Sequence, residues 1–184
     1  MIDLSRRRVL ILFAASAAVA TLSACATAPM VMTTANAQPV SSVYPAQARD
    51  ALNQMRRENN LPELVHNPVL QRVADEQAEI MARNGNIAHT AESGQAFITR
   101  LRRQNFWGGA GENLAGGPPN LASAIEGWMR SPAHHRVMVN PDYVQFGIAV
   151  RRGRSTPNNT YGTYWALIMG VMSPEMRAQL AASA

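Results

Sequence analysis

Residues 143–150, YVQFGIAV, decide the fold that this sequence predicts. Larger apolar side chains alternate here with smaller or polar ones, and they occupy positions 144, 146, 148 and 150. A period of two is typical of a β-strand with one buried face. Residues 163–171, TYWALIMGV, form a longer apolar run with aromatic side chains, and the intervening RRGRSTPNN is rich in turn-forming residues. The last third of the chain therefore predicts a hairpin of two strands.

The segments before this hairpin have the periodicity of helices. Apolar residues recur at three and four positions over residues 45–55 and again over residues 70–81. Gly85 stands where the second of these helices would end. A third helix is expected to begin after a cap at Asn120 and to be interrupted by Pro132. Helices followed by a hairpin predict an α+β domain in which helices cover a small antiparallel sheet.

Composition and charge limit the classes of function. The 184 residues are 47% hydrophobic and 16% charged, which is ordinary for one globular domain with a targeting segment. The formal net charge of +5 falls by two when Asp3 and the arginines at positions 6–8 are left out. So mild a positive charge predicts no nucleic-acid partner. The sequence contains no P-loop, no dinucleotide-binding fingerprint, no paired CxxC motif and no internal repeat.

The first 25 residues are organised as an export signal. Arginines at positions 6–8 precede an apolar run at 9–20, and small residues precede Cys25. The apolar run is too short to span a membrane comfortably. SRRRVL resembles a twin-arginine export signal, and LSAC at 22–25 resembles the lipobox at which bacterial lipoproteins are cleaved and acylated. Residues 1–25 are interpreted as a signal peptide with a lipobox, and Cys25 as the residue that carries the lipid.

Two routes to the cell envelope follow from this segment. A lipid on Cys25 would hold the protein on the periplasm-facing membrane, and Ala26 after it indicates the outer membrane by analogy with similar Gram-negative lipoproteins. The alternative is soluble secretion, because Ala35-Asn36-Ala37 also fits a small-residue cleavage site. After either cut the domain has no cysteine for an internal disulfide, so its stability must come from a packed core.

The remaining chain divides into three parts. Residues 26–43 lack any period and are expected to form a flexible tether. Residues 44–173 form the predicted folded domain. Residues 174–184 are expected to be a C-terminal tail, and the stretch SPEMRAQLAASA that contains them suits a short helix.

Three residues that could carry chemistry lie apart from the helical faces. They are His89, Glu112 and His134, separated by 23 and 22 positions. Glycines around Glu112, in GENLAGG at 111–117, let backbone approach whatever the carboxylate faces. Two histidines and a carboxylate suit zinc with an open position for water, although the local motif HExxH is absent. The alternative is that the histidines are solvated or bonded to carbonyl groups and that Glu112 bonds loop amides.

Four stretches resemble, in this order, the bacterial branch of the CAP superfamily, also called the SCP domain. They are ALNQMRRENNLPELVHNPVLQRVADEQAEIMARNGNIAHT, GENLAGG, AIEGWMRSPAHHRVMVNPDYVQFGIAV and YWALIMGV. The superfamily takes its name from cysteine-rich secretory proteins, antigen 5 and pathogenesis-related 1 proteins. The similarity covers about residues 44–173, and GENLA and the Trp-x-x-Ser-Pro-x-His run at 128–134 are its most specific parts.

The resemblance implies an α-β-α sandwich with a cleft that is lined by two histidines and acidic side chains, and that binds zinc in some members. His89 and His134 match the two cleft histidines, and Glu112 matches the acidic residue of the Gly-Glu-Asn motif. On this basis the glycines are expected to curve a loop so that Glu112 faces both imidazoles. Ser131 stands where many eukaryotic members have a second acidic residue, so a general base is not assured.

Other residues have expected supporting roles. Asn113 is expected either to orient Glu112 or to bond the backbone of its own loop. Trp107, beside glycines, is expected to support the cleft, whereas Trp128 and Trp165 are expected in the core.

These observations favour an exported, lipid-anchored protein that is not an enzyme and whose cleft binds a ligand, with zinc as a candidate metal. The family's association with lipids predicts a lipid or another small apolar ligand. One alternative is a zinc-dependent hydrolase that uses His89, Glu112 and His134. A second alternative is a surface interaction module whose polar cluster only ties segments together.

Overall fold

The computed structural model describes residues 40–153, 161–172, 174 and 177–178. The predicted signal peptide with Cys25, most of the predicted tether and most of the predicted tail lie outside the described residues. The folded part belongs to one compact unit, residues 35–184. Among the helices that the structure describes, none combines the length and the apolar character that a membrane span requires.

The three predicted helices are present, and each begins at a recognisable signal. Helix α1 spans Pro45–Glu58 and helix α2 spans Pro68–Asn84, so both begin with a proline, which is pre-organised for a first turn. Helix α2 ends at Gly85, whose φ of 67° is left-handed. Helix α4 spans Leu121–Arg130, and the Asn120 side chain caps it by accepting a backbone hydrogen bond.

Two short helices add to this set. Helix α3 spans Phe97–Arg103, and helix α5 spans Pro132–Met138. Pro132 interrupts the helical chain after α4, as expected. It also begins α5, because proline is well suited to the first helical turn. Seven residues are too few for a helical period to stand out, which is why the sequence does not predict these two elements.

The sheet has four strands in the order β1-β3-β4-β2. The strands are β1 (Val65–His66), β2 (Ala110–Gly116), β3 (Gln145–Arg152) and β4 (Thr163–Gly170). The β3–β4 pair is antiparallel, which confirms the predicted hairpin, and β2 is antiparallel to β4. The sheet is mixed, because the two-residue β1 runs parallel to β3.

The GENLAGG segment corrects one expectation. It was expected as a curved loop, but most of it lies in β2, which pairs with β4 from Ala110 opposite Gly170 to Gly116 opposite Tyr164. Glycine is unfavourable in strands, so local propensity does not indicate this element. Pairing with a buried neighbouring strand supplies the backbone hydrogen bonds that make it one.

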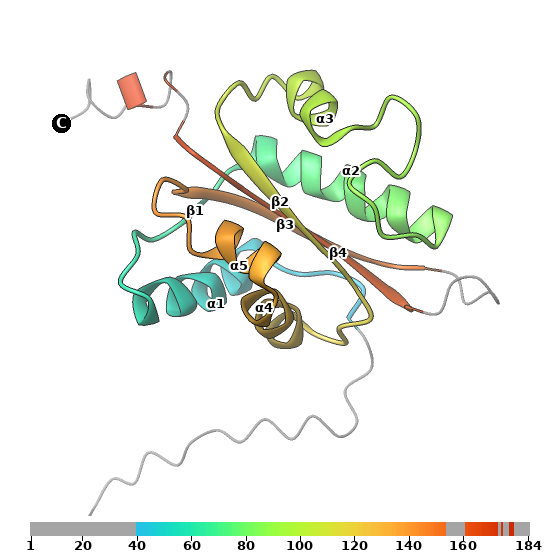
Figure 1. Ribbon diagram of the computed structural model, residues 1–184, viewed down its shortest axis with the longest axis horizontal. Helices are drawn as coiled ribbons and strands as arrows, with labels where there is room; N and C mark the ends of the chain where they lie inside the picture. Colours follow the sequence, from blue (N-terminus) through green and yellow to red (C-terminus); the bar gives the residue numbers. More distant parts are fainter. Residues whose placement is uncertain (1–39, 154–160, 173, 175–176, 179–184) are drawn as a thin grey trace, which may run out of the picture. The chain divides into compact units, whose positions relative to one another are not determined.

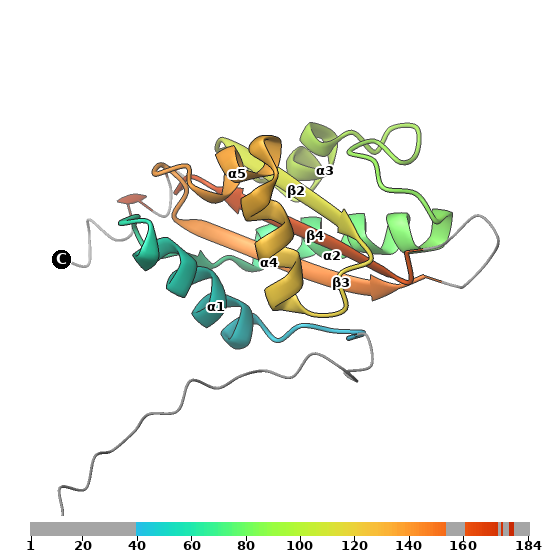
Figure 2. The same cartoon turned by 60° about the horizontal axis from the view of Figure 1, so that its bottom comes forward.

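Two hydrophobic cores lie on the two faces of the sheet. The side chains of Trp165, Leu167 and Met169 in β4 join helices α1 and α4 in one core. The intervening Ala166 and Ile168 join helices α2 and α3 in the other. Figures 1 and 2 show α1, α4 and α5 on one side of the sheet and α2 and α3 on the other. This arrangement confirms the expected α-β-α sandwich.

The two core tryptophans are buried as expected. Trp128 is 1% exposed and donates its indole N–H to the Leu114 carbonyl at 3.2 Å. Trp165 is 0% exposed and donates to the Pro118 carbonyl at 2.9 Å. Both indole groups are therefore satisfied inside the domain.

A buried arginine joins α1 to the segment that precedes β3. The Arg56 guanidinium donates to the carbonyl oxygens of Pro62, Met138, Asn140 and Tyr143 at 2.9 to 3.1 Å. Burial lowers the pKa of Arg56 because it disfavours the charged form. All its described acceptors are main-chain carbonyls, so the guanidinium holds the backbone after α1 and the backbone before β3 together.

Close packing of α2 on β3 requires glycine at position 147. A Cβ atom there would lie 2.2 Å from the Gln71 nitrogen and 2.3 Å from the Leu70 carbonyl carbon. Gly147→Ala should therefore lower the free energy of unfolding by at least about 2 kcal/mol, because backbone cannot yield as a flexible side chain does. Urea denaturation would measure the loss.

The matched control is Gly127→Ala in α4, where no atom lies within 4 Å of the added Cβ. This substitution should stabilise the domain by about 0.5–1 kcal/mol, because alanine favours a helix interior. Equal effects of the two substitutions would contradict the packing argument.

Candidate functional site

A buried carboxylate, Glu112, is the centre of the candidate site. Glu112 lies in the edge strand β2 opposite Ile168 of β4, and its side chain is 1% exposed. An isolated charge at such a position would be strongly unfavourable, so its partners decide what the site can do.

Arg100 and His89 share the two carboxylate oxygens. The Arg100 Nη2 donates to Oε2, and His89 Nδ1 lies 2.7 Å from Oε1. Arg100 is 0% exposed and also donates to the carbonyl oxygens of His89 at 3.1 Å and Gln95 at 2.5 Å. The same guanidinium therefore neutralises Glu112 and fixes the segment that carries His89.

The sequence carries one signal for Arg100, although this residue belongs to no motif. Phe97, Arg100 and Leu101 are three and four positions apart, so they share one face of α3. Leu101 is 2% exposed, and the Phe97 ring centroid lies 5.7 Å from the guanidinium carbon. A charge on the apolar face of a short helix predicts a buried partner.

Asn113 faces the opposite side of the sheet from Glu112. Successive strand residues point to opposite faces, and Asn113 pairs with Leu167, whose side chain belongs to the other core. The Asn113 Nδ2 donates to the His134 carbonyl at 3.0 Å. Asn113 thus holds α5, which carries His134, and the structure supports neither of the roles expected for it. The two histidine-bearing segments are fixed from opposite faces of one edge strand.

The glycines of β2 permit close packing. A Cβ atom at Gly111 would lie 3.0 Å from Val137 Cγ1 in α5. At Gly116 it would lie 2.3 Å from Ile87 Cδ1, in the segment that leads to His89. The glycines therefore let both histidine-bearing segments approach the strand, and the alternation of the strand, not a curved loop, orients Glu112.

The two histidines have pKa values shifted in opposite directions. The pKa of His89 is raised, chiefly by its hydrogen bond to Glu112, while partial burial opposes the shift. The pKa of His134 is lowered by burial and, to a smaller extent, by the charge of His89. Both causes favour the neutral form of His134, which is the form that binds metals.

The donor set around Glu112 fits the expected zinc ion only in part. In the part of the chain that the structure describes, no three His, Cys, Asp or Glu side chains are grouped to hold a metal. Both oxygens of Glu112 are engaged, and the Arg100 charge opposes a cation at the carboxylate. Glu112 fits better as the group that accepts the His89 Nδ1–H and leaves Nε2 free to bind a metal. His89 Nε2 and the His134 ring would then be the nitrogen donors available to a metal.

Trp107 lies apart from these contacts. It is 66% exposed, and the Arg102 guanidinium carbon lies 4.6 Å from its ring centroid. The structure thus brings His89 and Glu112 together and places Asn113 against the His134 backbone. Trp107 is instead presented on the surface.

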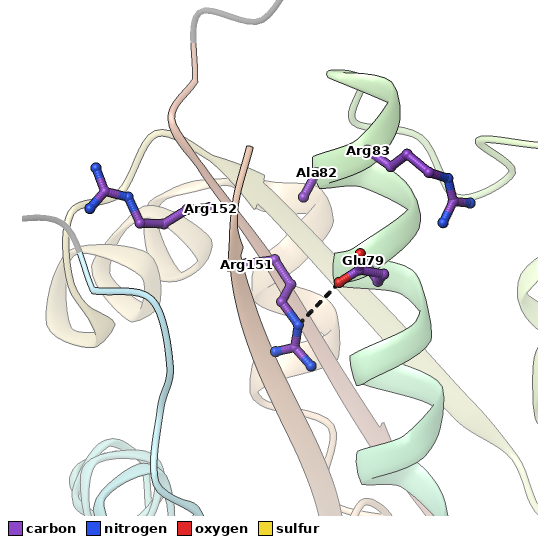
Figure 3. A pocket seen from close by; sticks show the side chains of 5 residues that line it. All are labelled: Glu79, Ala82, Arg83, Arg151 and Arg152. Carbon is purple, nitrogen blue, oxygen red and sulfur yellow. Dashed lines mark ion pairs between the residues drawn. The ribbon is translucent and has the colours of Figure 1, made fainter. Parts of the chain in front are cut away.

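A separate hollow of about 380 Å³ lies between α2 and the end of β3 (Figure 3). Arg151 Nε lies 3.4 Å from Glu79 Oε2, and Arg83 pairs with Glu92 at 2.6 Å. Figure 3 shows Arg83 and Arg152 extending away from each other. The guanidinium groups around this hollow therefore do not converge on one anion, and the hollow is not lined by the residues of the candidate site.

The buried ion pair should be far more sensitive than an exposed one. Arg100→Met leaves Glu112 buried without its cation and should cost about 3–5 kcal/mol of unfolding free energy. The matched control is Arg130→Met, because Arg130 pairs with Glu126 on the surface and both side chains are more than 60% exposed. It should cost less than about 1 kcal/mol. Similar losses in urea denaturation would contradict this account of the site.

The histidine shifts can be measured by NMR titration. The pKa of His89 should lie above the usual value of about 6.5, and that of His134 below it. His89→Asn should raise the pKa of His134, because it removes a nearby positive charge. An unchanged His134 pKa would contradict the proximity of the two rings.

The raised pKa of His89 also gives a pH dependence of stability. Because folding favours its protonated form, its contribution is complete below the unfolded pKa of about 6.5 and is lost as pH rises through the folded pKa. The His89 side chain is 62% exposed, so the contribution should not exceed about 1 kcal/mol. Urea denaturation of the parent and His89→Asn should converge at alkaline pH.

Comparison with proteins of known sequence identifies a relative among membrane proteins. The "uncharacterized membrane protein YlbC" of Bacillus subtilis (strain 168) is 29% identical over 113 residues. This match covers 61% of the present chain and 33% of the relative, so the chain spans about a third of that protein's length.

Solved structures share the fold. An extracellular SCP-domain protein of Bacillus anthracis has a TM-score of 0.59 at 23% identity, over 69% of this chain and 40% of that one. An outer surface protein of Borrelia burgdorferi has a TM-score of 0.60 at 22% identity, over 72% and 98%. Residues 49–169, more than half of the chain, match the CAP family, described as the cysteine-rich secretory protein family. The chain therefore belongs to the CAP family.

Proposed function

We propose that this protein is a binding module of the cell envelope, without catalytic activity, whose ligand site lies at the edge of β2 between His89 and His134. The observation that carries the proposal is the buried Glu112, held between Arg100 and a His89 ring that is 62% exposed. A fixed carboxylate that orients an accessible imidazole is the arrangement of a ligand site. The two imidazoles would hold zinc, which would supply a Lewis acid to an incoming ligand.

The same contacts favour binding over hydrolysis. In the hydrolase alternative, a separate base would have to take a proton from water, and Glu112 is the carboxylate nearest to this role. Its two oxygens are already occupied by His89 and Arg100. Ser131, at the position of a second acid in many relatives, cannot replace it. The chain's own residues therefore support positioning better than proton transfer.

The proposed location outside the cytoplasm rests on two supports. The first is the predicted signal peptide, with acylation at Cys25 and the outer membrane as destination, or with soluble release after Ala37. The second is the nature of the similar proteins, which are named as membrane, extracellular or outer surface proteins. Location and anchor are tested by labelling the protein with a lipid precursor and by substituting Cys25.

The second candidate, a small apolar ligand, is supported by a groove on the opposite side of the sheet from Glu112. This groove, of about 410 Å³, lies between α1 and α4, and its apolar lining residues include Met55, Ile125 and Met129. Its chemistry supports the expectation of a lipid or a similar molecule. In the remaining hypothesis, a surface interaction module, substitutions in either place would leave partner binding unchanged.

Zinc binding tests the site directly. Calorimetry on a chain that lacks residues 1–37 should detect one ion per protein, and His89→Ala and His134→Ala should each abolish this binding. Glu112→Gln should weaken it by about 10–100-fold, because it removes the orienting group. His66→Ala is the matched control, since His66 lies in β1 and contacts Gln71.

Circular dichroism must show that each variant is folded. Binding that survives both His89→Ala and His134→Ala would overturn the proposed metal site. Binding that is lost in the His66→Ala control as well would show that the site lies elsewhere.

A further inference from the structure

The most exposed tryptophan of the domain contacts Arg102 of α3, a helix that also carries an exposed isoleucine. Trp128 and Trp165 are buried, whereas Trp107 is 66% exposed and Ile98 in α3 is 53% exposed. A tryptophan this exposed contributes little to the core, so its position calls for another explanation.

The surrounding chain holds Trp107 outward. Phe106 is 3% exposed and points into the core, so the next side chain faces out. A Cβ atom at Gly108 would lie 3.1 Å from Val171 Cγ2, which shows how closely the backbone after the tryptophan packs on Val171. The Arg102 guanidinium lies over the indole at 4.6 Å and donates to the Phe106 carbonyl at 2.8 Å. The indole is thus pre-positioned on the surface.

Two positive charges at this place have no acidic partner among the described contacts. Arg102 bonds the Phe106 carbonyl, and Arg72 in α2 donates to the Gln104 side chain at 2.8 Å. Ile98 and Arg102 are four positions apart and so lie on the same side of α3. We call the surface formed by Ile98, Arg102, Trp107 and Arg72 the α3 face.

The α3 face is accessible and separate from the groove between α1 and α4. Figures 1 and 2 show α3 on the opposite side of the sheet from α1 and α4, on the same side as α2. Arg100, on another side of the same short helix, points inward to Glu112. One helix thus supports the candidate site from within and carries the α3 face outside.

We propose that the α3 face docks on the surface of an anionic phospholipid bilayer. Tryptophan settles at the membrane interface, where its ring meets acyl chains and its N–H meets water or headgroups. Ile98 would enter the interface beside it. The guanidinium groups of Arg102 and Arg72, which have no acidic partner among the described contacts, are complementary to lipid phosphates. The charge complementarity selects an anionic membrane over a neutral one.

The α3 face is small, so its binding to a membrane should be weak and reversible. One indole, one isoleucine side chain and two arginines form a small surface, and peripheral membrane binding normally needs two signals acting together. The face therefore orients a domain against a bilayer and does not anchor it permanently. This inference is independent of ligand binding at His89 and His134.

The test uses the chain without residues 1–37, so that no lipid anchor contributes. The probes are vesicles of equal parts phosphatidylglycerol and phosphatidylcholine, and vesicles of phosphatidylcholine alone. Cosedimentation should detect binding to the anionic vesicles, and tryptophan emission should shift to shorter wavelength. Trp107→Ala should abolish the shift, because Trp128 and Trp165 are buried already. Arg102→Gln and Arg72→Gln should each weaken partitioning about fivefold.

Matched controls come from other surfaces. Tyr44→Ala removes an aromatic side chain that is 73% exposed at the start of α1, and Arg152→Gln removes an exposed arginine at the end of β3. Both should leave vesicle binding unchanged, and Trp107→Ala should keep the parent's urea midpoint.

Three results would overturn the proposal. They are no binding to anionic vesicles, equal binding to neutral vesicles, and equal losses in the control variants and in the α3-face variants. Trp107-dependent binding to isolated peptidoglycan without vesicle binding would instead assign the face to a glycan. Zinc calorimetry on the same variants keeps the outcome separate from that of the His89 site.

Discussion

The burial of β4 on both faces is the constraint on which the rest of the structure depends. All eight residues of this strand are buried, and their side chains alternate between two cores. An apolar strand of this kind needs neighbours at both edges and helices over both faces. With β3 at one edge of β4 and β2 at the other, β2 becomes an outer strand of the sheet. The candidate site lies on that outer strand because the central strands β3 and β4 are buried in the cores.

The site follows from the two-residue period of a strand. Adjacent residues of β2 face different layers, so Glu112 reaches Arg100 and His89 while Asn113 reaches the backbone of His134. One short edge strand therefore holds segments from both helical layers in place. The buried arginine changes the chemical character of the carboxylate, because it turns a candidate ligand or base into a neutralised structural group. The imidazole nitrogens remain as the groups that are available to bind a ligand.

The predictable elements are those with a long periodic segment or a strong local signal. Helices α1, α2 and α4 and the β3–β4 hairpin follow from periodicity, caps and turn residues. Strand β2 does not, because glycine obscures its pattern and only pairing with β4 creates it. The contact of His89 with Glu112 follows from the family resemblance, whereas Arg100 was missed because it belongs to no motif. Its signal, a charge between Phe97 and Leu101, becomes clear once α3 is known to be a helix.

The hydrogen bonds of the buried Arg56 side chain affect the order in which the chain can fold. Three of its four acceptors lie 82 to 87 residues further along, on Met138, Asn140 and Tyr143. The central strand β4 lies later still in the sequence. Helix α1 can therefore form early but cannot be locked into place until nearly the whole domain has emerged. Contacts of such long sequence separation form late, because the entropy of closing the intervening chain must be overcome before they contribute.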